Sequence, residues 1–448
     1  MALSPLRRSL AWGLTFFSVL VTSSTLFAQS QPVALDTLPV TQPAATPVQP
    51  AAESPYEAGI SPSEGAFVRT RDRAWSMRMG VLTQVRFSAS STPDPSRALE
   101  FVPVLGRLIL QGTVGAPWLR YFTQIEFAGQ QSPAAMGPVP PSPRLLDVYF
   151  EAQPTDAFGV RAGLTRVPIS RQWIIGLHKT LLFDRSDANL FFRNHGPVAQ
   201  GSPAGTPLMP PWDRDIGAYV FGTPFNGKLE YFAGIFNGNG ALFGRNNQPW
   251  LMPAARIAIN PLGRMAAEET TALSNAHQPL RLQFAASAFY NQYGTTRTPD
   301  ATMPTVIERD REGQLMVELE ATMHVAGVYL SAEGYARDRH TSGPNGFDNR
   351  HMELGTTVTA GWMFVPQRLE LAARASVVHT NMSVVASNRQ SYDLALNGYV
   401  FGNNLKLQLR YTAALSDAPL MGGIPSEMIS IPGGLLVHTV GLWSQLQL

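Results

Sequence analysis

The feature that most constrains this chain is a series of short segments in which apolar and polar residues alternate with a period of two. Such alternation, with β-rich composition, predicts strands whose two faces meet different environments. From Trp75 onward there are sixteen such segments: Trp75–Ala89, Val102–Val114, Leu119–Ala128, Leu145–Ala152, Gly159–Arg166, three strands around Asp215–Asn260, Leu280–Tyr293, Gln314–Val325, Val328–Arg337, Met352–Val365, Leu369–Thr380, Tyr392–Phe401, Leu405–Leu415 and Val437–Leu448.

The connections between these segments alternate between short and long. The tight connections lie near Ala116, Thr155, Asn226, Ala326, Pro366 and Asn403, and the long ones near Ser91, Ala134, Gly201, Asn239, Thr298, Gly343, Ser383 and Gly423. One connection, Pro261–Gln278, is long where a short turn is due. An even strand count with this alternation predicts an all-β, 16-stranded antiparallel transmembrane β-barrel with short periplasmic turns and long extracellular loops. A soluble β-sandwich does not show such a strict alternation.

The composition agrees with a barrel. Only 15% of the residues are charged, yet no run of about 18 apolar residues follows the N-terminal region, so no transmembrane helix is expected after processing. The apolar residues of a barrel strand do not form a continuous run, because every other residue faces water. The chain contains no cysteine, which excludes disulfides, thiolate metal sites and cysteine nucleophiles.

Three regions are expected along the chain. Residues 1–28 have the basic and apolar pattern of a signal peptide, with Ala28 at the cleavage site; an uncleaved anchor helix is the alternative. Residues 29–66 are rich in Pro, Ala, Gln, Thr and Ser and predict a disordered periplasmic linker, either a simple spacer or a tether to an envelope partner. Residues 67–448 would form the barrel.

The charge of the mature chain is balanced. Residues 1–28 contain Arg7 and Arg8 and no acidic residue, so their removal leaves 32 basic and 32 acidic residues. Nothing in this balance argues for nucleic-acid binding, and an anion preference must come from the local placement of charges.

Many charges share the parity that faces the lumen. The predicted pore-lining arginines are Arg78, Arg86, Arg107, Arg120, Arg161, Arg374 and Arg410, and Arg281 and Lys406 have the same parity. Because a 16-stranded barrel leaves a water-filled lumen, we expect these charges to stay hydrated. They could offer anions successive weak sites. Alternatively, they could pair with glutamates across strands and stiffen the wall; for the set from Arg78 to Arg161 we favour a contribution to the lumen field.

The longest irregular region, Val167–Asp213, is the predicted constriction loop. It carries Arg171, Lys179, Arg185 and Arg193 beside Asp184 and Asp187, together with the apolar runs WIIGL, LLF and LFF. Long loops in a compact fold are usually functional or disordered, and this apolar content argues against disorder. We expect the loop to pack on the inner wall; packing outside, against a neighbouring subunit, is the alternative.

No enzymatic or metal site is predicted. The eight histidines have no ligand spacing such as HExxH. The sequence also contains neither GxSxG nor a glycine-rich phosphate loop. We therefore expect neither a cofactor nor catalysis. Trp75, Trp118, Trp362 and Phe364 lie near strand ends at the short-turn rim, where they fit an aromatic girdle.

The stretches GKLEYFAGIFNGNG and AARIAINPLG, with RAGLTRVPISRQW, LLFDRS and RDIG before them, resemble the phosphate-selective porin O/P family of Gram-negative outer membranes. The resemblance implies a 16-stranded barrel, usually trimeric, that passes anions, with its inward-folded loop at Val167–Asp213. Family members specific for phosphate are expected to have clusters of lysine, whereas only Lys179, Lys228 and Lys406 exist here.

These observations predict an outer-membrane porin, a passive channel for small hydrophilic solutes with a weak anion preference. Its expected partners are outer-membrane lipid, small inorganic anions and two further copies of itself. The alternative is a structural barrel that engages envelope partners through its Pro-rich segment.

Overall fold

The computed structural model describes residues 54–61, 64–91, 99–128, 143–194, 214–238, 240, 250–270, 278–296, 309–342, 348–382, 388–416 and 435–448. The predicted signal peptide and the first part of the predicted linker lie outside the described residues.

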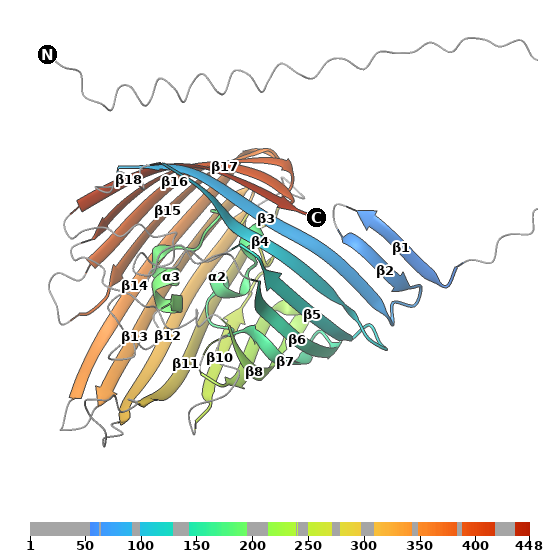
Figure 1. Cartoon of the computed structure of the whole chain (residues 1–448), viewed down its shortest axis with the longest axis horizontal. Coiled ribbons are helices and arrows are strands. Elements are labelled where there is room, and N and C mark those ends of the chain that lie inside the picture. Colours follow the sequence, from blue (N-terminus) through green and yellow to red (C-terminus); the bar gives the residue numbers. More distant parts are fainter. Residues whose placement is uncertain are drawn as a thin grey trace, which may run out of the picture. The chain divides into compact units, whose positions relative to one another are not determined.

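Within this described part of the chain, sixteen antiparallel strands form a closed barrel (Figure 1). Each strand from β3 to β18 pairs with the next, and β18 pairs with β3 to close the sheet. The strands are β3 (Ser76–Ser90), β4 (Leu99–Thr113), β5 (Leu119–Glu126), β6 (Arg144–Thr155), β7 (Phe158–Arg166), β8 (Arg214–Gly222), β9 (Leu229–Phe236), β10 (Met252–Ile259), β11 (Arg281–Thr296), β12 (Arg309–Val325), β13 (Val328–Ser342), β14 (Asp348–Val365), β15 (Leu369–His379), β16 (Asn388–Phe401), β17 (Leu405–Ser416) and β18 (Leu435–Gln447).

The predicted fold class is confirmed, and its physical basis is the alternation of side chains along each strand. In β10, Met252, Ala254, Arg256 and Ala258 are buried, whereas the residues between them are exposed. The exposed residues include Ile257 and Ile259, which belong to the apolar outer face of the barrel. A one-residue slip in register would exchange the two faces, so the pattern also determines the register.

The short connections are tight turns, as predicted. β12 ends at Val325 and β13 begins at Val328, so Ala326 and Gly327 form the entire turn. Both have positive φ, 46° and 82°, which is the geometry that two-residue hairpin turns require. No helix among the described residues is long and apolar enough to cross a membrane.

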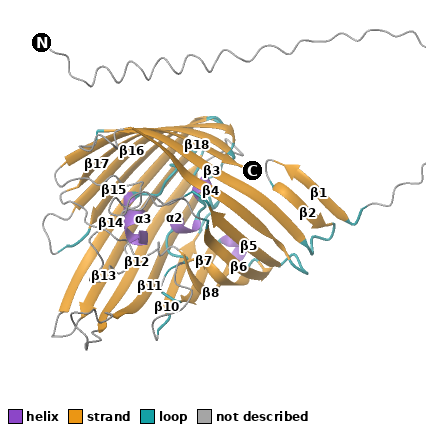
Figure 2. Ribbon diagram, viewed as in Figure 1, coloured by secondary structure: helices purple, strands orange, loops and turns teal. Residues whose placement is uncertain are grey.

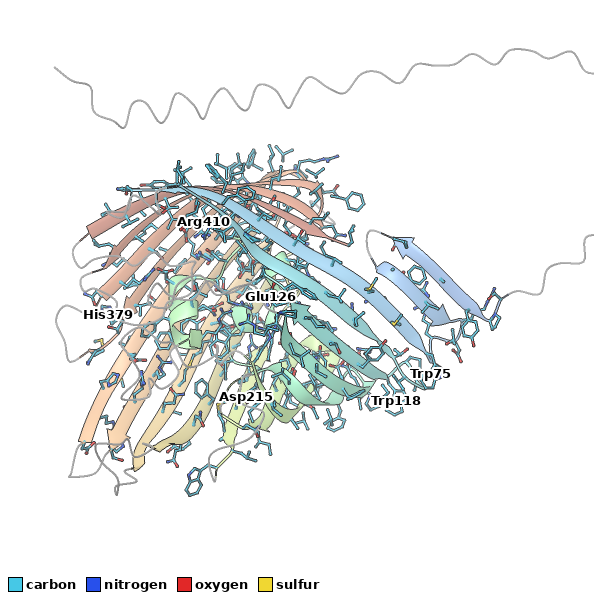
Figure 3. All side chains as sticks on the ribbon, viewed as in Figure 1. Trp75, Trp118, Glu126, Asp215, His379 and Arg410 are labelled. Atoms are coloured by element: carbon cyan, nitrogen blue, oxygen red, sulfur yellow. The ribbon has the colours of Figure 1, made fainter. Side chains whose placement is uncertain are left out.

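Aromatic side chains mark the short-turn rim. Trp75, Trp118, Trp362 and Phe364 are all exposed there, as expected for an interfacial girdle. Figure 3 shows Trp75 and Trp118 at one end of the barrel and His379, at the end of β15, near the other.

A β-hairpin precedes the barrel, and it corrects the predicted extent of the linker. Strands β1 (Tyr56–Ser61) and β2 (Gly65–Thr70) pair with each other, so these parts of the chain form strands, although the predicted linker extends to residue 66. β2 also pairs with the first residues of β3, from Ser76 to Met79.

The hairpin covers the part of β3 that the last strand does not reach. The Leu448 N–H donates to the carbonyl of Val81 at 2.9 Å, and the Val81 N–H donates back at 3.1 Å. From Ser76 to Met79, β2 replaces β18 as the neighbour of β3. The hairpin thus satisfies backbone groups that would otherwise form a free sheet edge.

Candidate functional site

The lumen contains a segment that leaves β7 and folds inward; we call residues 167–194 the inward loop. It carries helix α2 (Arg171–Ile174), the 3-10 turn η2 (Leu177–Lys179) and helix α3 (Asp187–Asn194), and Figure 2 shows both helices inside the ring of strands. Helix α3 packs against β13, β14 and β15. The inward loop therefore lies on the inner wall and not outside the barrel. Residues 195–213 of the predicted constriction loop lie outside the described residues.

Apolar side chains attach the inward loop to the wall. Trp173, Ala188 and Phe192 are fully buried in a cluster with residues of β8 to β15, and the Phe192 ring stacks on Tyr335 with 5.2 Å between centroids. This contact explains the apolar runs WIIGL and LFF, which would be costly to expose in a solvated loop.

Glycines of β14 make room for these side chains. A Cβ at Gly355 would come within 2.5 Å of the Phe192 ring, and one at Gly361 within 2.9 Å of Leu181. A larger residue at either position would push the loop away from the wall.

Polar contacts determine the path of the loop. Arg166, the last residue of β7, donates from Nη1 to the carbonyls of Trp173, Ile174 and Ile175 at 3.1, 2.8 and 2.9 Å. These carbonyls end α2 and would otherwise be left without partners. At the start of α2, the Ser170 hydroxyl accepts from the Trp173 N–H at 3.3 Å.

A second segment enters the lumen from the opposite rim; we call residues 260–270 the opposing loop. It is the connection that the sequence showed to be long where a short turn was due. The Gly263 N–H donates to the Asn260 carbonyl at 3.0 Å, which closes a turn with Pro261 at its second position. The chain then reaches Glu269, which is buried.

The two loops bind each other directly. The Leu181 N–H donates to Glu269 Oε2 at 2.7 Å, and the Glu269 N–H donates to the Lys179 carbonyl at 2.9 Å. Arg171 Nη2 donates to the carbonyls of Glu268, at 3.0 Å, and Ala266. Burial raises the pKa of Glu269, and the hydrogen bond from Leu181 opposes that rise.

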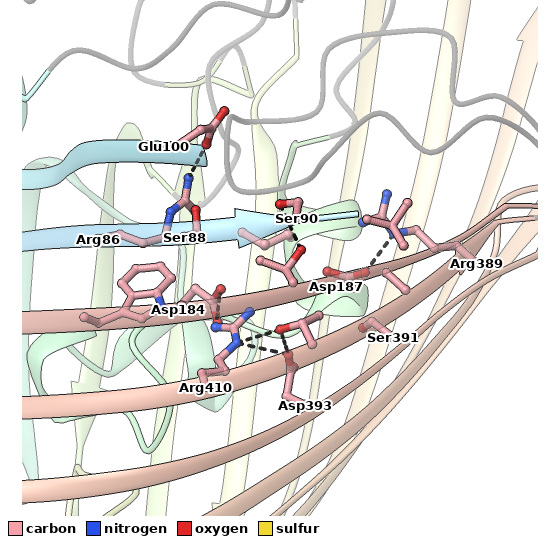
Figure 4. A pocket seen from close by; sticks show the side chains of 17 residues that line it. Arg86, Ser88, Ser90, Glu100, Asp184, Asp187, Arg389, Ser391, Asp393 and Arg410 are labelled. Carbon is pink, nitrogen blue, oxygen red and sulfur yellow. Dashed lines mark hydrogen bonds and ion pairs between the residues drawn. The ribbon is translucent and has the colours of Figure 1, made fainter. Parts of the chain in front are cut away.

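An ion-pair network joins the inward loop to strands β15, β16 and β17. Asp184 pairs with Arg410 at 2.6 Å, and Arg410 also pairs with Asp393 of β16 (Figure 4). Asp184 also accepts from Arg374 of β15 at 2.8 Å, and Arg374 pairs with Asp393 as well. Burial alone would raise the pKa of Asp184, but Arg410 and Arg374 outweigh it and lower the pKa to about 2. Asp184 is therefore ionised, and it links the loop to three strands.

Lys406 and Gln408 of β17 complete the attachment. Lys406 Nζ donates to the carbonyls of Thr180 and Leu181, each at 2.9 Å, and Gln408 Nε2 donates to the Leu181 carbonyl at 3.2 Å. Arg389 of β16 pairs with Asp187, in the first turn of α3, at 2.7 Å. An acidic residue is favourable at that end of a helix.

The expectation that the lumen arginines stay hydrated is wrong for four of the seven. Arg86, Arg107, Arg374 and Arg410 are 4% to 11% exposed and are ion-paired, so their guanidinium groups stabilise the wall and the loop. Arg107, for example, lies 2.6 Å from Glu126 on the neighbouring strand. For Arg374 and Arg410 the inward loop contributes directly, because its Asp184 pairs with both; Arg86 and Arg107 pair with glutamates of the neighbouring strand.

The remaining three arginines lie toward the short-turn rim and keep more contact with solvent. The side chains of Arg78, Arg120 and Arg161 are 38%, 51% and 23% exposed. Arg78 pairs with Glu64, and both Arg120 and Arg161 pair with Glu151. Their role in an anion path stays a prediction.

The four cations of the predicted constriction loop also differ in how far they are buried. Arg171 and Arg185 are buried and bind within the loop region; Arg185 Nε donates to the Gln172 carbonyl at 2.6 Å. Lys179 is exposed and Arg193 is partly buried.

Sequence reasoning did not assign a site to several residues that build the lumen. Asp184 and Lys406 were noticed only as charges, and Glu269 was not singled out, although its segment was. Arg69 and Arg73 follow the predicted linker, which ends at residue 66; the alternation in EAGIS and GAFVRT is the signal that indicates the hairpin.

The described part of the lumen contains a cavity toward each rim. The cavity toward the long loops has a volume of about 60 Å³ and is lined by Arg86, Arg389 and Arg410 together with Glu100, Asp184, Asp187 and Asp393 (Figure 4). The cavity at the short-turn side has a volume of about 580 Å³. Among the described residues, no group of three or more acidic, histidine or cysteine side chains could hold a metal ion.

No family model and no curated protein sequence matches the chain. Solved structures do match. The anion-selective porin from Comamonas acidovorans is 13% identical with a TM-score of 0.51, and the match covers 84% of this chain and 100% of that one. OmpT, an outer membrane protein of Vibrio cholerae, is 10% identical with a TM-score of 0.50, covering 84% and 98%.

A third match is the outer membrane channel DcaP of Acinetobacter baumannii, 10% identical with a TM-score of 0.50, covering 85% of this chain and 99% of that chain. At these identities the likeness shows the fold alone. The chain is similar in fold to outer-membrane porins and channels, and membership in the phosphate-selective porin O/P family stays a prediction.

Proposed function

We propose that this protein is an outer-membrane porin, a passive diffusion channel for small hydrophilic solutes with a weak preference for anions. The observation that carries the proposal is a closed 16-stranded barrel with an apolar outer face and with cations still exposed at its narrowed lumen. Barrels of this strand number enclose an aqueous channel. A loop folded onto the inner wall narrows such a channel.

The proposed weak anion preference rests on which charged side chains keep contact with solvent in the lumen. Arg78, Arg120 and Lys179 keep solvent contact, and Glu64 and Glu100 keep somewhat less, whereas Asp184, Glu126 and Glu269 are buried. Exposed charges set the field that a passing ion meets, because buried ion pairs largely cancel each other. This placement supports a modest excess of positive potential.

High-affinity phosphate transport is not supported. Lys406 is buried and bound to the carbonyls of the inward loop, and Lys228 lies in the turn between β8 and β9. The charge of Lys406 is therefore engaged by the loop backbone next to Lys179, and Lys228 belongs to a turn elsewhere in the chain, so the three lysines do not offer their charges together to one solute. Lysine is a compact point charge that arginine does not replace at a phosphate site.

Planar-bilayer recordings test this function. Folded protein should produce channel steps, and reversal potentials in a KCl gradient should show a modest chloride preference. Boiled protein is the negative control. Folded protein without channel steps would contradict the proposal and favour the alternative, a structural barrel that engages envelope partners through its Pro-rich segment.

A homotrimer in the outer membrane belongs to the same proposal. Its support is the resemblance to the porin O/P family, whose members are usually trimers, and the apolar outer face, which suits contact with lipid or with another subunit. Cross-linking of the protein in native membranes, followed by a gel without boiling, should give a band at three times the monomer mass. A monomer as the largest species would contradict this part of the proposal.

A further inference from the structure

The cavity at the short-turn side is strongly basic. Among its lining residues are five arginines, Arg69, Arg73, Arg78, Arg120 and Arg161, and two glutamates, Glu64 and Glu151. The hairpin and the segment that joins it to β3 supply Arg69, Arg73 and Glu64, whereas β3 to β7 supply the rest. The cavity is therefore complete only when the hairpin lies against the barrel.

Four of the five arginines form two sets, and each set shares one glutamate of the cavity; Arg69 also pairs with Glu57, which is outside the lining, at 2.8 Å. Arg69 and Arg78 share Glu64, at 3.2 and 3.4 Å. Arg120 and Arg161 share Glu151. Each guanidinium has five N–H donors, so neither glutamate saturates its pair of arginines. The two glutamates show that each set of arginines can bind a carboxylate.

One wall of the cavity is aromatic. The rings of Phe122 and Tyr149 stack with 5.2 Å between centroids, and the Arg161 guanidinium lies 4.2 Å from the centre of the Tyr149 ring. A surface of this kind packs against a flat apolar body. Inorganic anions alone make no use of it.

The size of the cavity agrees with an organic ligand. At about 580 Å³ it falls in the range of small-molecule sites, of order 300–1,000 Å³. We infer that this cavity binds small organic dianions, with one acid group at the Arg69–Arg78 set, the other at the Arg120–Arg161 set, and a flat apolar body against Phe122 and Tyr149. The inference deepens the proposed function, because such a site would concentrate these solutes at one mouth of the channel.

Binding can be measured without any channel activity. The probe is naphthalene-2,6-dicarboxylate, a rigid fluorescent molecule with an acid group at each end, titrated with folded full-length protein in detergent and followed by fluorescence anisotropy. Arg78→Gln and Arg120→Gln should each weaken binding at least about threefold, because each removes a charged donor to one acid group. Arg368→Gln is the matched control: Arg368 is an exposed arginine in the turn between β14 and β15, outside the cavity lining.

Glu64→Gln separates binding from a structural role. If Glu64 competes with the ligand for Arg69 and Arg78, its neutralisation should tighten binding, whereas loss of a merely structural ion pair would weaken it. A heat-dependent shift in gel mobility verifies that each variant is folded. Binding that is unchanged in Arg78→Gln and Arg120→Gln, or weakened in Glu64→Gln, would overturn the inference.

Two further ligands test the chemical class. The neutral 2,6-diamide of naphthalene should not displace the probe, and inorganic phosphate should displace it only at much higher concentration. Equal displacement by the diamide would rule out the acid groups, and equal displacement by phosphate would rule out the apolar body. If the probe does not bind but the protein gives normal channel steps in bilayers, the inference fails and the proposed function stands. If the probe binds but no channel steps appear, the inference stands and the proposed function fails.

Discussion

Glu269 accepts a hydrogen bond of 2.7 Å from the backbone N–H of Leu181, although the two residues reach the lumen from opposite rims of the barrel. Leu181 belongs to the inward loop and Glu269 to the opposing loop. Both residues are buried, so water cannot replace the contact without opening the interface. The narrow part of the lumen is thus one unit made from two loops.

Removal of the Glu269 side chain should loosen this unit. Glu269→Ala leaves the buried Leu181 N–H without its acceptor, at a cost of about 1–3 kcal/mol. Single-channel recordings should then show a larger or more fluctuating conductance than wild type. Glu268→Ala is the control, because the hydrogen bond between Glu268 and Arg171 uses the Glu268 backbone carbonyl, which the substitution keeps. Identical conductance in wild type and Glu269→Ala would show that the opposing loop does not limit the path.

The network around Asp184 should make stability depend on pH in the acid range. The folded-state pKa of about 2 lies below the ordinary value of 3.8, so the ionised carboxylate contributes stability above pH 3.8 that is lost as pH falls through about 2. Asp184→Asn should cost about 2 kcal/mol at neutral pH, and the difference from wild type should vanish near pH 2.

Urea unfolding in detergent, followed by tryptophan fluorescence from pH 7 to pH 2, measures this difference. Asp348→Asn serves as the control, because Asp348 is exposed and pairs with His340 at the long-loop rim. A gap between wild type and Asp184→Asn that stayed constant over this pH range would contradict the assignment.

Shortening the inward loop should widen the channel. Deletion of part of Ser186–Pro210, with α3 included, removes a helix that packs on β13, β14 and β15 inside the lumen. Single-channel conductance should rise. Phe192→Ala is the gentler variant: it removes the ring stacked on Tyr335, at a cost of about 3–5 kcal/mol, without shortening the chain. A folded deletion variant with wild-type conductance would mean that α3 does not border the path.

Ion selectivity should respond to Arg120 and not to Arg107. The sequence suggested that both arginines project into an anion path, but Arg107 is buried against Glu126, whereas Arg120 is half exposed at the short-turn rim. Arg120→Gln should therefore reduce chloride preference in reversal-potential measurements. Arg107→Gln should instead lower stability, by about 3–5 kcal/mol, because it leaves Glu126 buried without its partner.

Gel-mobility shifts on heating compare the two variants directly. The Arg107→Gln band should unfold at a lower temperature than wild type, and the Arg120→Gln band at the same temperature. A selectivity change in Arg107→Gln equal to that in Arg120→Gln would show that the Arg107–Glu126 pair is open to passing ions.

The strands and their order could be predicted from the sequence because a barrel strand is a local pattern. Each strand carries its own period-two alternation, and each tight turn carries residues such as Ala326 and Gly327 at the point where the chain reverses. Even the long connection Pro261–Gln278 stood out as an exception. The hairpin before the barrel was missed because its short strands follow a Pro-rich stretch.

The partners of the lumen charges were decided only by the tertiary structure. Asp184 meets Arg374 across 190 residues of sequence, and Leu181 meets Lys406 across 225. Alternation tells which face of a strand a residue takes, but not what lies opposite that face. Whether an inward arginine is hydrated or buried depends on where the inward loop packs, and that position results from many weak contacts with remote strands. For this reason the sequence alone determined the wall of this protein, and the folded chain determined which charges remain open to solvent.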